Sequence, residues 1–160
     1  MQVYILRHGI AEEVRHGGSD ADRALTNEGR KKLREVLRLA EKADVVPSVI
    51  ITSPYVRAVQ TAEVVIEVLG YANDLLRTEA LVPSSDALAV WEEIRAHQGV
   101  MQLMLVGHEP LLSQVVAFLL NSTALMVDVK KGALIRIDIE GFGAQPHGIL
   151  RWMVVPKLAA

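Results

Sequence analysis

The chain has 160 residues, a formal net charge of −2 and no cysteine. This length fits one domain, residues 1–160, that buries roughly 70% of the surface its unfolded chain exposes. The near-neutral charge argues against general nucleic-acid binding, and the lack of cysteine excludes disulfides, thiol nucleophiles and cysteine-based metal sites. We expect a cytoplasmic protein without a membrane span, because no apolar run approaches ~18 residues.

The first predicted element is a buried strand that starts at Val3 and ends on Arg7, His8 and Gly9. Its β-branched and aromatic residues favour a strand over a secretion leader. Open α/β sheets bind ligands beyond the carboxyl ends of their strands, where charged side chains can point into a crevice. We therefore interpret His8 as a nucleophile and Arg7 as a phosphate clamp.

A polar loop over residues 11–24 follows this strand and contains His16, which could touch a substrate. The next predicted element is an amphipathic helix capped by Thr26. Its apolar residues recur at helical spacing, and its arginine and lysine residues lie on the outer face.

Residues 49–51 form a second predicted strand, and a helix begins after it at Pro54 and ends at Gly70. Arg57 lies in the first turn of this helix, where the helix dipole disfavours a cation, so we expect it to help bind an anion. Ser53 is expected to cap the helix and could also reach a bound phosphate.

The second half of the chain continues the alternation of strands and helices. A third buried strand is predicted over residues 100–106, directly before His108, and a helix follows Pro110. The remaining predicted elements are a short strand within residues 75–81, a helix that starts after residues 84–86, and an antiparallel hairpin over residues 132–139 and 148–155.

This order predicts a three-layer α/β/α sandwich with a mostly parallel central sheet and an antiparallel C-terminal hairpin. Parallel strands share one carboxyl edge, so Arg7, His8, Ser53, Arg57 and His108 should converge there. Two histidines and two arginines in one crevice suit phosphoryl transfer through a covalent phosphohistidine. The guanidinium groups would bind the equatorial oxygens, and a protonated His108 would add a donor.

Several motifs together resemble those of the histidine phosphatase superfamily, which has the phosphoglycerate mutase-like fold. These motifs are Leu6-Arg7-His8-Gly9, Ser53-Pro54 with Arg57-Ala58 and Gln60-Thr61-Ala62, and Gly107-His108 with Pro110. Within the superfamily, the chain looks most like the SixA-type phosphohistidine phosphatases. The resemblance implies that His8 is the nucleophile and that Arg7, Arg57 and His108 form the phosphate pocket.

One departure from the superfamily pattern bears on the substrate. Many members carry a glutamate that protonates a leaving alkoxide, whereas this chain has Leu81-Val82-Pro83 at the corresponding position. An ester substrate would therefore lack its acid unless Glu79 or Asp86 substitutes for it. A phosphoramidate needs the acid less, because imidazole is a better leaving group than an alkoxide.

The segments around the site are too short to form a lid, which suits a phosphohistidine displayed on a partner protein such as a phosphotransfer domain. Inorganic phosphate would be the product. We expect no cofactor and no metal, because no HxxxH or HxH spacing occurs. Two alternatives remain open: a small-molecule phosphomonoesterase of the same fold, and a non-catalytic module that binds a phosphorylated partner.

Overall fold

The computed structural model describes residues 1–160 and contains a six-stranded sheet flanked by helices. The strands are β1 (Gln2–Arg7), β2 (Val49–Thr52), β3 (Leu75–Arg77), β4 (Gln102–Gly107), β5 (Leu134–Asp138) and β6 (Ile149–Val154). The helices are α1 (Asn27–Lys42), α2 (Val56–Leu69), α3 (Ala87–Ala96), α4 (Leu111–Leu119) and α5 (Pro156–Ala159), with the 3₁₀ helices η1 (Asp20–Asp22) and η2 (Glu79–Leu81).

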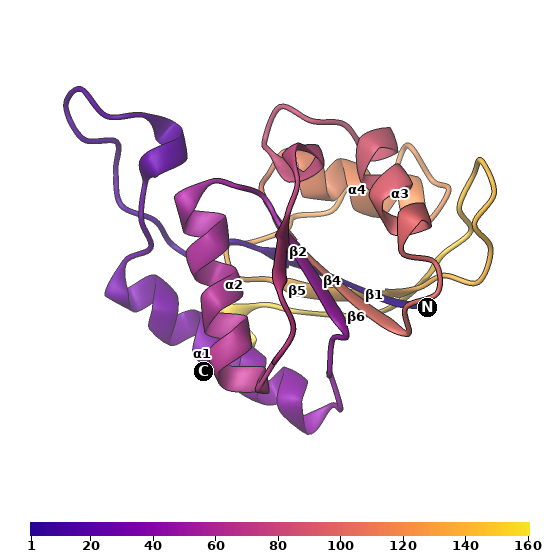
Figure 1. The fold of residues 1–160 in the computed structure, drawn as a ribbon, viewed down its shortest axis with the longest axis horizontal. Coiled ribbons are helices and arrows are strands. Elements are labelled where there is room, and N and C mark those ends of the chain that lie inside the picture. The colour runs from indigo at the N-terminus through magenta and orange to yellow at the C-terminus, as the bar shows by residue number, and fades with distance from the viewer.

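The strand order in the sheet is β3-β2-β4-β1-β5-β6. The first four of these strands are parallel, whereas β5 is antiparallel to both β1 and β6. The predicted mostly parallel sheet with an antiparallel C-terminal hairpin is therefore confirmed (Figure 1). Strand β1 lies inside the sheet, between β4 and β5, so its carboxyl end has a strand on either side.

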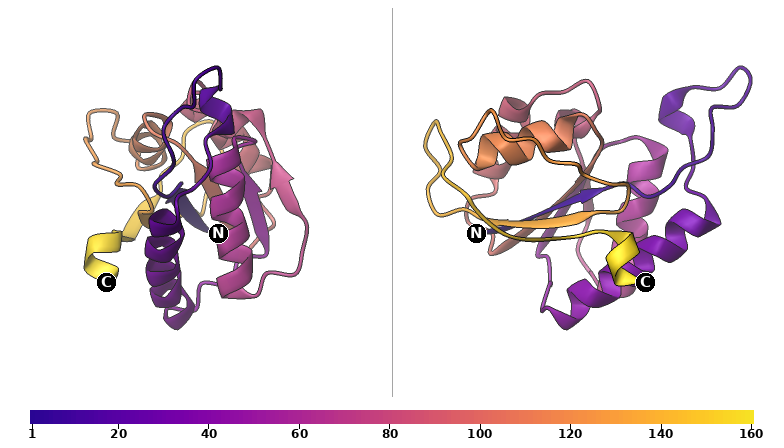
Figure 2. Two further views of the ribbon diagram at one scale, coloured as in Figure 1. Left: turned by 90° about the vertical axis from the view of Figure 1, so that its left-hand side faces the viewer. Right: turned by 180° about the vertical axis from the view of Figure 1, so that it is seen from behind.

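The helices cover both faces of the sheet, as the turned views show (Figure 2). Alternate side chains of β1 point to opposite faces, as the pleat of a strand requires. Val3 and Ile5 belong to the hydrophobic core that α3 and α4 complete. Tyr4 and Leu6 belong to the core formed with α1 and α2. All four side chains are fully buried, so the three-layer architecture is confirmed.

Helix α1 is positioned against the segment that follows the nucleophile strand. The Thr26 hydroxyl accepts the Gly29 amide at 2.9 Å, which confirms the predicted N-cap. A Cβ atom on Gly29 would lie 2.3 Å from the Ile10 carbonyl oxygen. Only glycine therefore allows α1 to pack this closely beside the chain that leaves β1.

Helix α2 begins at Val56, two residues later than predicted. Pro54 precedes the N-cap residue Tyr55, which makes no side-chain capping bond. Its end was predicted correctly, because Gly70 adopts a left-handed conformation with φ of 67°. Arg57 lies in the first turn of α2, as expected.

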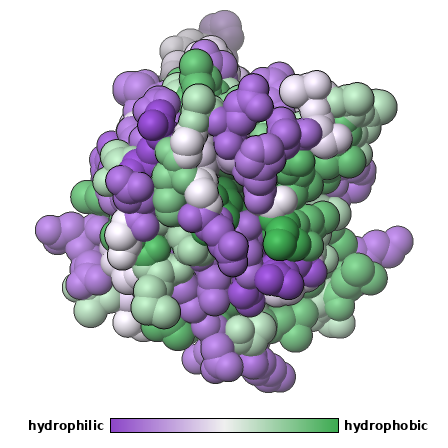
Figure 3. Space-filling model, turned by 90° about the vertical axis from the view of Figure 1, so that its right-hand side faces the viewer, coloured by the Kyte–Doolittle hydropathy of each residue, from purple (hydrophilic) through white to green (hydrophobic).

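The polar loop over residues 11–24 contains the 3₁₀ helix η1, which the lack of periodicity did not reveal. It lies above the N-terminal part of α2 in Figure 1, and η1 contacts α2. None of the helices combines the length and the apolarity that crossing a bilayer requires. On the face drawn in Figure 3, hydrophobic side chains lie interspersed with hydrophilic ones.

Candidate active site

The two histidines singled out in the sequence meet where β1 and β4 end. These strands pair in parallel with Arg7 opposite Gly107, and the His8 amide donates to the Gly107 carbonyl oxygen at 3.0 Å. His8 and His108 therefore leave neighbouring strands side by side, and their ring centroids are 5.0 Å apart. Both side chains are buried, with 4% and 1% of their surface exposed.

The protonation of His8 follows from its hydrogen bonds. Its Nδ1 lies 2.7 Å from the Gly9 carbonyl oxygen, which can only accept, so Nδ1 carries the proton. Burial, together with the charges of Arg57 and Arg7, lowers the pKa of His8 to about 3. The ring is therefore neutral at pH 7, and Nε2 keeps the lone pair that a nucleophile needs.

Arg57 links this nitrogen to the loop over residues 11–24. Its Nε donates to His8 Nε2 at 3.3 Å. Its two terminal nitrogens donate to the Asp20 carbonyl oxygen at 2.7 Å and to the Asp20 carboxylate at 3.0 Å. Although burial raises the pKa of Asp20, the hydrogen bonds from Arg57 and Arg23 hold it below its ordinary value, so the carboxylate is ionised at pH 7.

Arg7 and His108 contribute buried nitrogen atoms that have no hydrogen-bond partner. Arg7 donates from one terminal nitrogen to the Val129 carbonyl oxygen at 2.8 Å, but its Nε makes no bond. His108 bonds through Nε2, and its Nδ1 is unpaired. Arg7 Nε and His108 Nδ1 are the only buried side-chain nitrogen or oxygen atoms in the chain without a partner. Because unpaired buried polar groups are costly, they indicate a place where a polar ligand is bound.

Burial, followed by the charges of His8, Arg57 and Arg7, lowers the pKa of His108 to about 3. His108 is therefore neutral at pH 7 when no anion is bound, and the expected protonated ring remains a prediction for the site with a phosphoryl group bound. The main physical reason is that burial removes the charged ring from water, and the two guanidinium groups in the same region make a further positive charge still less favourable.

Ser53 is not the cap of α2, so that expectation was wrong. Its hydroxyl lies 2.8 Å from His108 Nε2 and accepts the Tyr55 amide at 3.2 Å. The helix starts too far along the chain for Ser53 to cap it, and the side chain holds the second imidazole instead. Thr61 connects α2 to the segment that follows β1, because its hydroxyl accepts a hydrogen bond from the Gly9 amide at 3.2 Å and donates to the Arg57 carbonyl oxygen at 2.7 Å.

Three residues considered as substrate or acid groups do not join this cluster. His16 lies in an exposed turn of the loop over residues 11–24 and bonds to none of the four residues. Glu79 is exposed at the start of η2. Asp86 accepts the Ala89 amide as the N-cap of α3, so its carboxylate serves that helix.

Asp20 is the site residue that sequence reasoning missed. It lies in a loop without periodicity, 37 positions before its partner Arg57. The signal that could have pointed to it is an acidic side chain in the loop directly after Arg7-His8-Gly9. No group of three or more histidine, aspartate or glutamate side chains is arranged to hold a metal ion.

The arrangement as a whole is suited to a tetrahedral anion. It combines a neutral imidazole whose Nε2 carries no proton, the guanidinium groups of Arg7 and Arg57, and two buried nitrogen atoms without partners. Guanidinium forks match phosphoryl oxygens well. Burial lowers the pKa of both arginines, but arginine still stays charged at pH 7.

Comparisons with known proteins identify the family of the chain. Residues 3–81 match the model of the histidine phosphatase superfamily (branch 1). The chain is 29% identical to phosphohistidine phosphatase SixA of Escherichia coli (strain K12), over 98% of this chain and 94% of that protein. It is 33% identical to a SixA homolog of Haemophilus influenzae, over 73% of this chain and 76% of that protein.

A structure of the protein histidine phosphatase SixA complexed with tungstate superimposes with a TM-score of 0.88, at 27% identity and with all of both chains covered. The match of the family model includes Arg7, His8 and Arg57. The chain therefore belongs to the histidine phosphatase superfamily.

Proposed function

We propose that this protein is a phosphatase that removes the phosphoryl group from phosphohistidine on a partner protein, through a phosphorylated His8. The observation that carries the proposal is the state of His8. Its Nδ1 proton is bonded to the Gly9 carbonyl oxygen, and its Nε2 lone pair lies among the donors of the site. An imidazole held in this way can attack phosphorus without first losing a proton.

In the first step, His8 Nε2 attacks the phosphorus atom and the bond from phosphorus to the substrate nitrogen breaks. The electron pair of that bond goes to the leaving imidazole, which departs neutral when its other ring nitrogen carries a proton. Arg7, Arg57 and His108 bind the equatorial oxygens as charge develops on them. A bound dianion would also favour the charged form of His108 and raise its pKa.

In the second step, water attacks the phosphorylated His8. The nitrogen–phosphorus bond breaks, its electron pair returns to Nε2, and inorganic phosphate and a proton are released. His8 Nδ1 keeps its proton and donates a hydrogen bond to the Gly9 carbonyl oxygen throughout, which keeps the ring oriented for both steps.

The placement of the carboxyl groups supports phosphohistidine rather than an ester as substrate. An alkoxide leaving group needs a protonated acid beside it. Glu79 is exposed and Asp86 caps a helix, whereas Asp20 reaches the site but has a lowered pKa. None of the three makes a hydrogen bond to His8 or His108 that would hold an acid beside the leaving group. The names of the SixA relatives support the same substrate class.

The test compares free phosphohistidine and a phosphotransfer domain phosphorylated on histidine with p-nitrophenyl phosphate and sugar phosphates. We expect rapid release of phosphate from the phosphohistidine substrates, loss of that activity in His8→Ala, and acid-labile phosphate on the wild-type enzyme during turnover. Glu79→Gln should leave the activity unchanged. Faster turnover of esters that depends on Glu79 would contradict the proposed substrate. Tight phosphate binding without turnover of any substrate would contradict catalysis.

A further inference from the structure

A basic groove with a volume of about 430 Å³ lies beside the candidate active site. Five cationic side chains line this groove, and no carboxylate does. The cationic residues are Arg7, Lys32, Lys130, Lys131 and Lys157. Because the chain as a whole has a formal charge of −2, this concentration of positive charge is a local feature.

The main chain ties the basic groove to the nucleophile. The Gly132 amide donates to the carbonyl oxygens of Arg7 and His8, both at 3.1 Å. Lys131 therefore directly precedes the residue whose amide is bonded to the backbone of His8. Arg7 belongs to both regions, since it lines the groove and its charge contributes to lowering the pKa of the adjacent His8.

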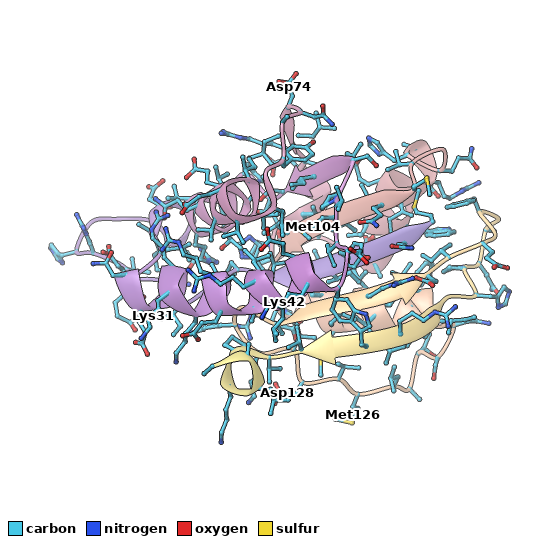
Figure 4. The ribbon with its side chains drawn as sticks, turned by 90° about the horizontal axis from the view of Figure 1, so that it is seen from below. Lys31, Lys42, Asp74, Met104, Met126 and Asp128 are labelled. Atoms are coloured by element: carbon cyan, nitrogen blue, oxygen red, sulfur yellow. The ribbon has the colours of Figure 1, made fainter.

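Helix α5 brings the remaining lysine to the same place. Gly132 has a φ of 77°, and a Cβ atom there would lie 3.0 Å from Pro156 Cγ. The first residue of α5 thus packs directly on the turn that carries Lys131, and Lys157 comes next in the chain. Figure 4 shows α5 in yellow, below α1 and near the segment with Asp128.

Half of the lysines of the groove have no carboxylate partner. Lys130 pairs with Asp128 at 2.8 Å, and Lys32 pairs with Glu28 at 3.1 Å. Lys131 and Lys157 are exposed and form no ion pair. Charges that nothing in the chain neutralises are available to an acidic partner.

We propose that the basic groove receives a carboxylate-rich surface next to the phosphohistidine of the substrate protein. This inference rests on the proposed function and deepens it by naming the charge of the partner. Lysines on long flexible stems suit carboxylates spread over a protein surface, whereas a second phosphate on a small molecule is better matched by rigid arginine forks. The net negative charge of the chain disfavours nucleic acid as the occupant.

The experiment uses two peptides of equal length, each phosphorylated on a central histidine and flanked by either four glutamates or four glutamines. The kcat/KM of each is measured at low salt, together with kcat for free phosphohistidine. Two exposed ion pairs predict about a fivefold preference of the wild-type enzyme for the glutamate peptide. Lys131→Glu/Lys157→Glu should abolish this preference without changing turnover of free phosphohistidine.

The matched control reverses two exposed cations in the C-terminal half of α1 that lie outside the groove, Arg38→Glu/Lys42→Glu. This variant should keep the fivefold preference. Equal kcat/KM values for the two peptides with the wild-type enzyme, or the same loss in both double variants, would overturn the proposal. So would a preference for a sugar bisphosphate over its monophosphate that depends on Lys131 and Lys157, because the groove would then be a second phosphate site.

Binding separates this inference from the proposed function. The two peptides are also titrated into His8→Ala, which cannot form the phosphoenzyme. Tighter binding of the glutamate peptide, lost on reversing Lys131 and Lys157, would support the groove even if the wild-type enzyme hydrolyses no phosphohistidine. Equal binding would reject the groove while leaving hydrolysis of free phosphohistidine intact.

Discussion

Two buried neutral imidazoles make the stability of this protein sensitive to acid. The pKa values of His8 and His108 fall from 6.5 to about 3 in the folded chain, chiefly through burial. Between these two values the unfolded chain binds more protons than the folded one, so stability is lost as the pH falls below 6.5. At pH 5 each imidazole costs about 2 kcal/mol relative to pH 7, and the pair costs about 4 kcal/mol. That is a large part of the about 5–15 kcal/mol that stabilises a typical domain.

The measurement is urea unfolding at pH 7 and pH 5, in a buffer without phosphate because a bound dianion would raise both pKa values. The fluorescence of Trp91, which is fully buried, reports unfolding. His8→Gln/His108→Gln removes both groups while keeping all carboxylates, and His16→Gln is the control in an exposed turn. The wild-type protein should lose about 4 kcal/mol more than the double variant between the two pH values. Equal losses, or imidazole NMR signals of His8 and His108 that titrate near pH 6.5, would refute the reasoning.

Three further substitutions test the contacts that build the site. Ser53→Ala removes the hydroxyl that lies 2.8 Å from a buried His108 nitrogen, so the free energy of unfolding should fall by about 1–3 kcal/mol and kcat by about tenfold. An unchanged urea midpoint would contradict this. Gly29→Ala adds a Cβ 2.3 Å from the Ile10 carbonyl oxygen, so the free energy of unfolding should fall by about 2 kcal/mol or more and the melting temperature should drop, although alanine normally favours a helix. A higher melting temperature would show that α1 can shift. Asp20→Ala removes the carboxylate that holds the Arg57 guanidinium beside the nucleophile, so kcat/KM should fall by about tenfold. The free energy of unfolding should change by at most about 1 kcal/mol, because the carboxylate is 52% exposed, and unchanged kinetics would show that Asp20 has no role in the site.

The convergence of the four principal residues was predictable because it follows from topology. Arg7, His8 and His108 lie at or just after the carboxyl end of a strand, Arg57 lies in the first turn of the helix that follows another strand, and parallel strands share that edge. The structure brings His8, Arg57 and His108 into one cluster, as this rule requires. The alternation of buried strands and amphipathic helices also sufficed to predict the layers, because hydrophobic periodicity is a local property of the sequence.

Local sequence patterns could not predict contacts between side chains that lie far apart in the sequence. Ser53 precedes a helix and was interpreted as its cap, yet its hydroxyl contacts His108, 55 positions away. Asp20 lies in an aperiodic loop, so nothing in its neighbourhood pointed to Arg57. The charge of His108 depends on burial and on cations from other elements, which no motif specifies.

The two imidazoles leave strands whose spacing is a main-chain dimension. His8 and His108 emerge from adjacent strands, and their centroid separation of 5.0 Å is close to the distance of about 4.8 Å between neighbouring strands. Backbone hydrogen bonds therefore set the spacing of the strands that carry the two imidazoles, while the Gly9 carbonyl oxygen and the Ser53 hydroxyl orient the rings. Core substitutions that lower the free energy of unfolding should for this reason leave kcat nearly unchanged in the molecules that remain folded. Stability and turnover can therefore vary independently.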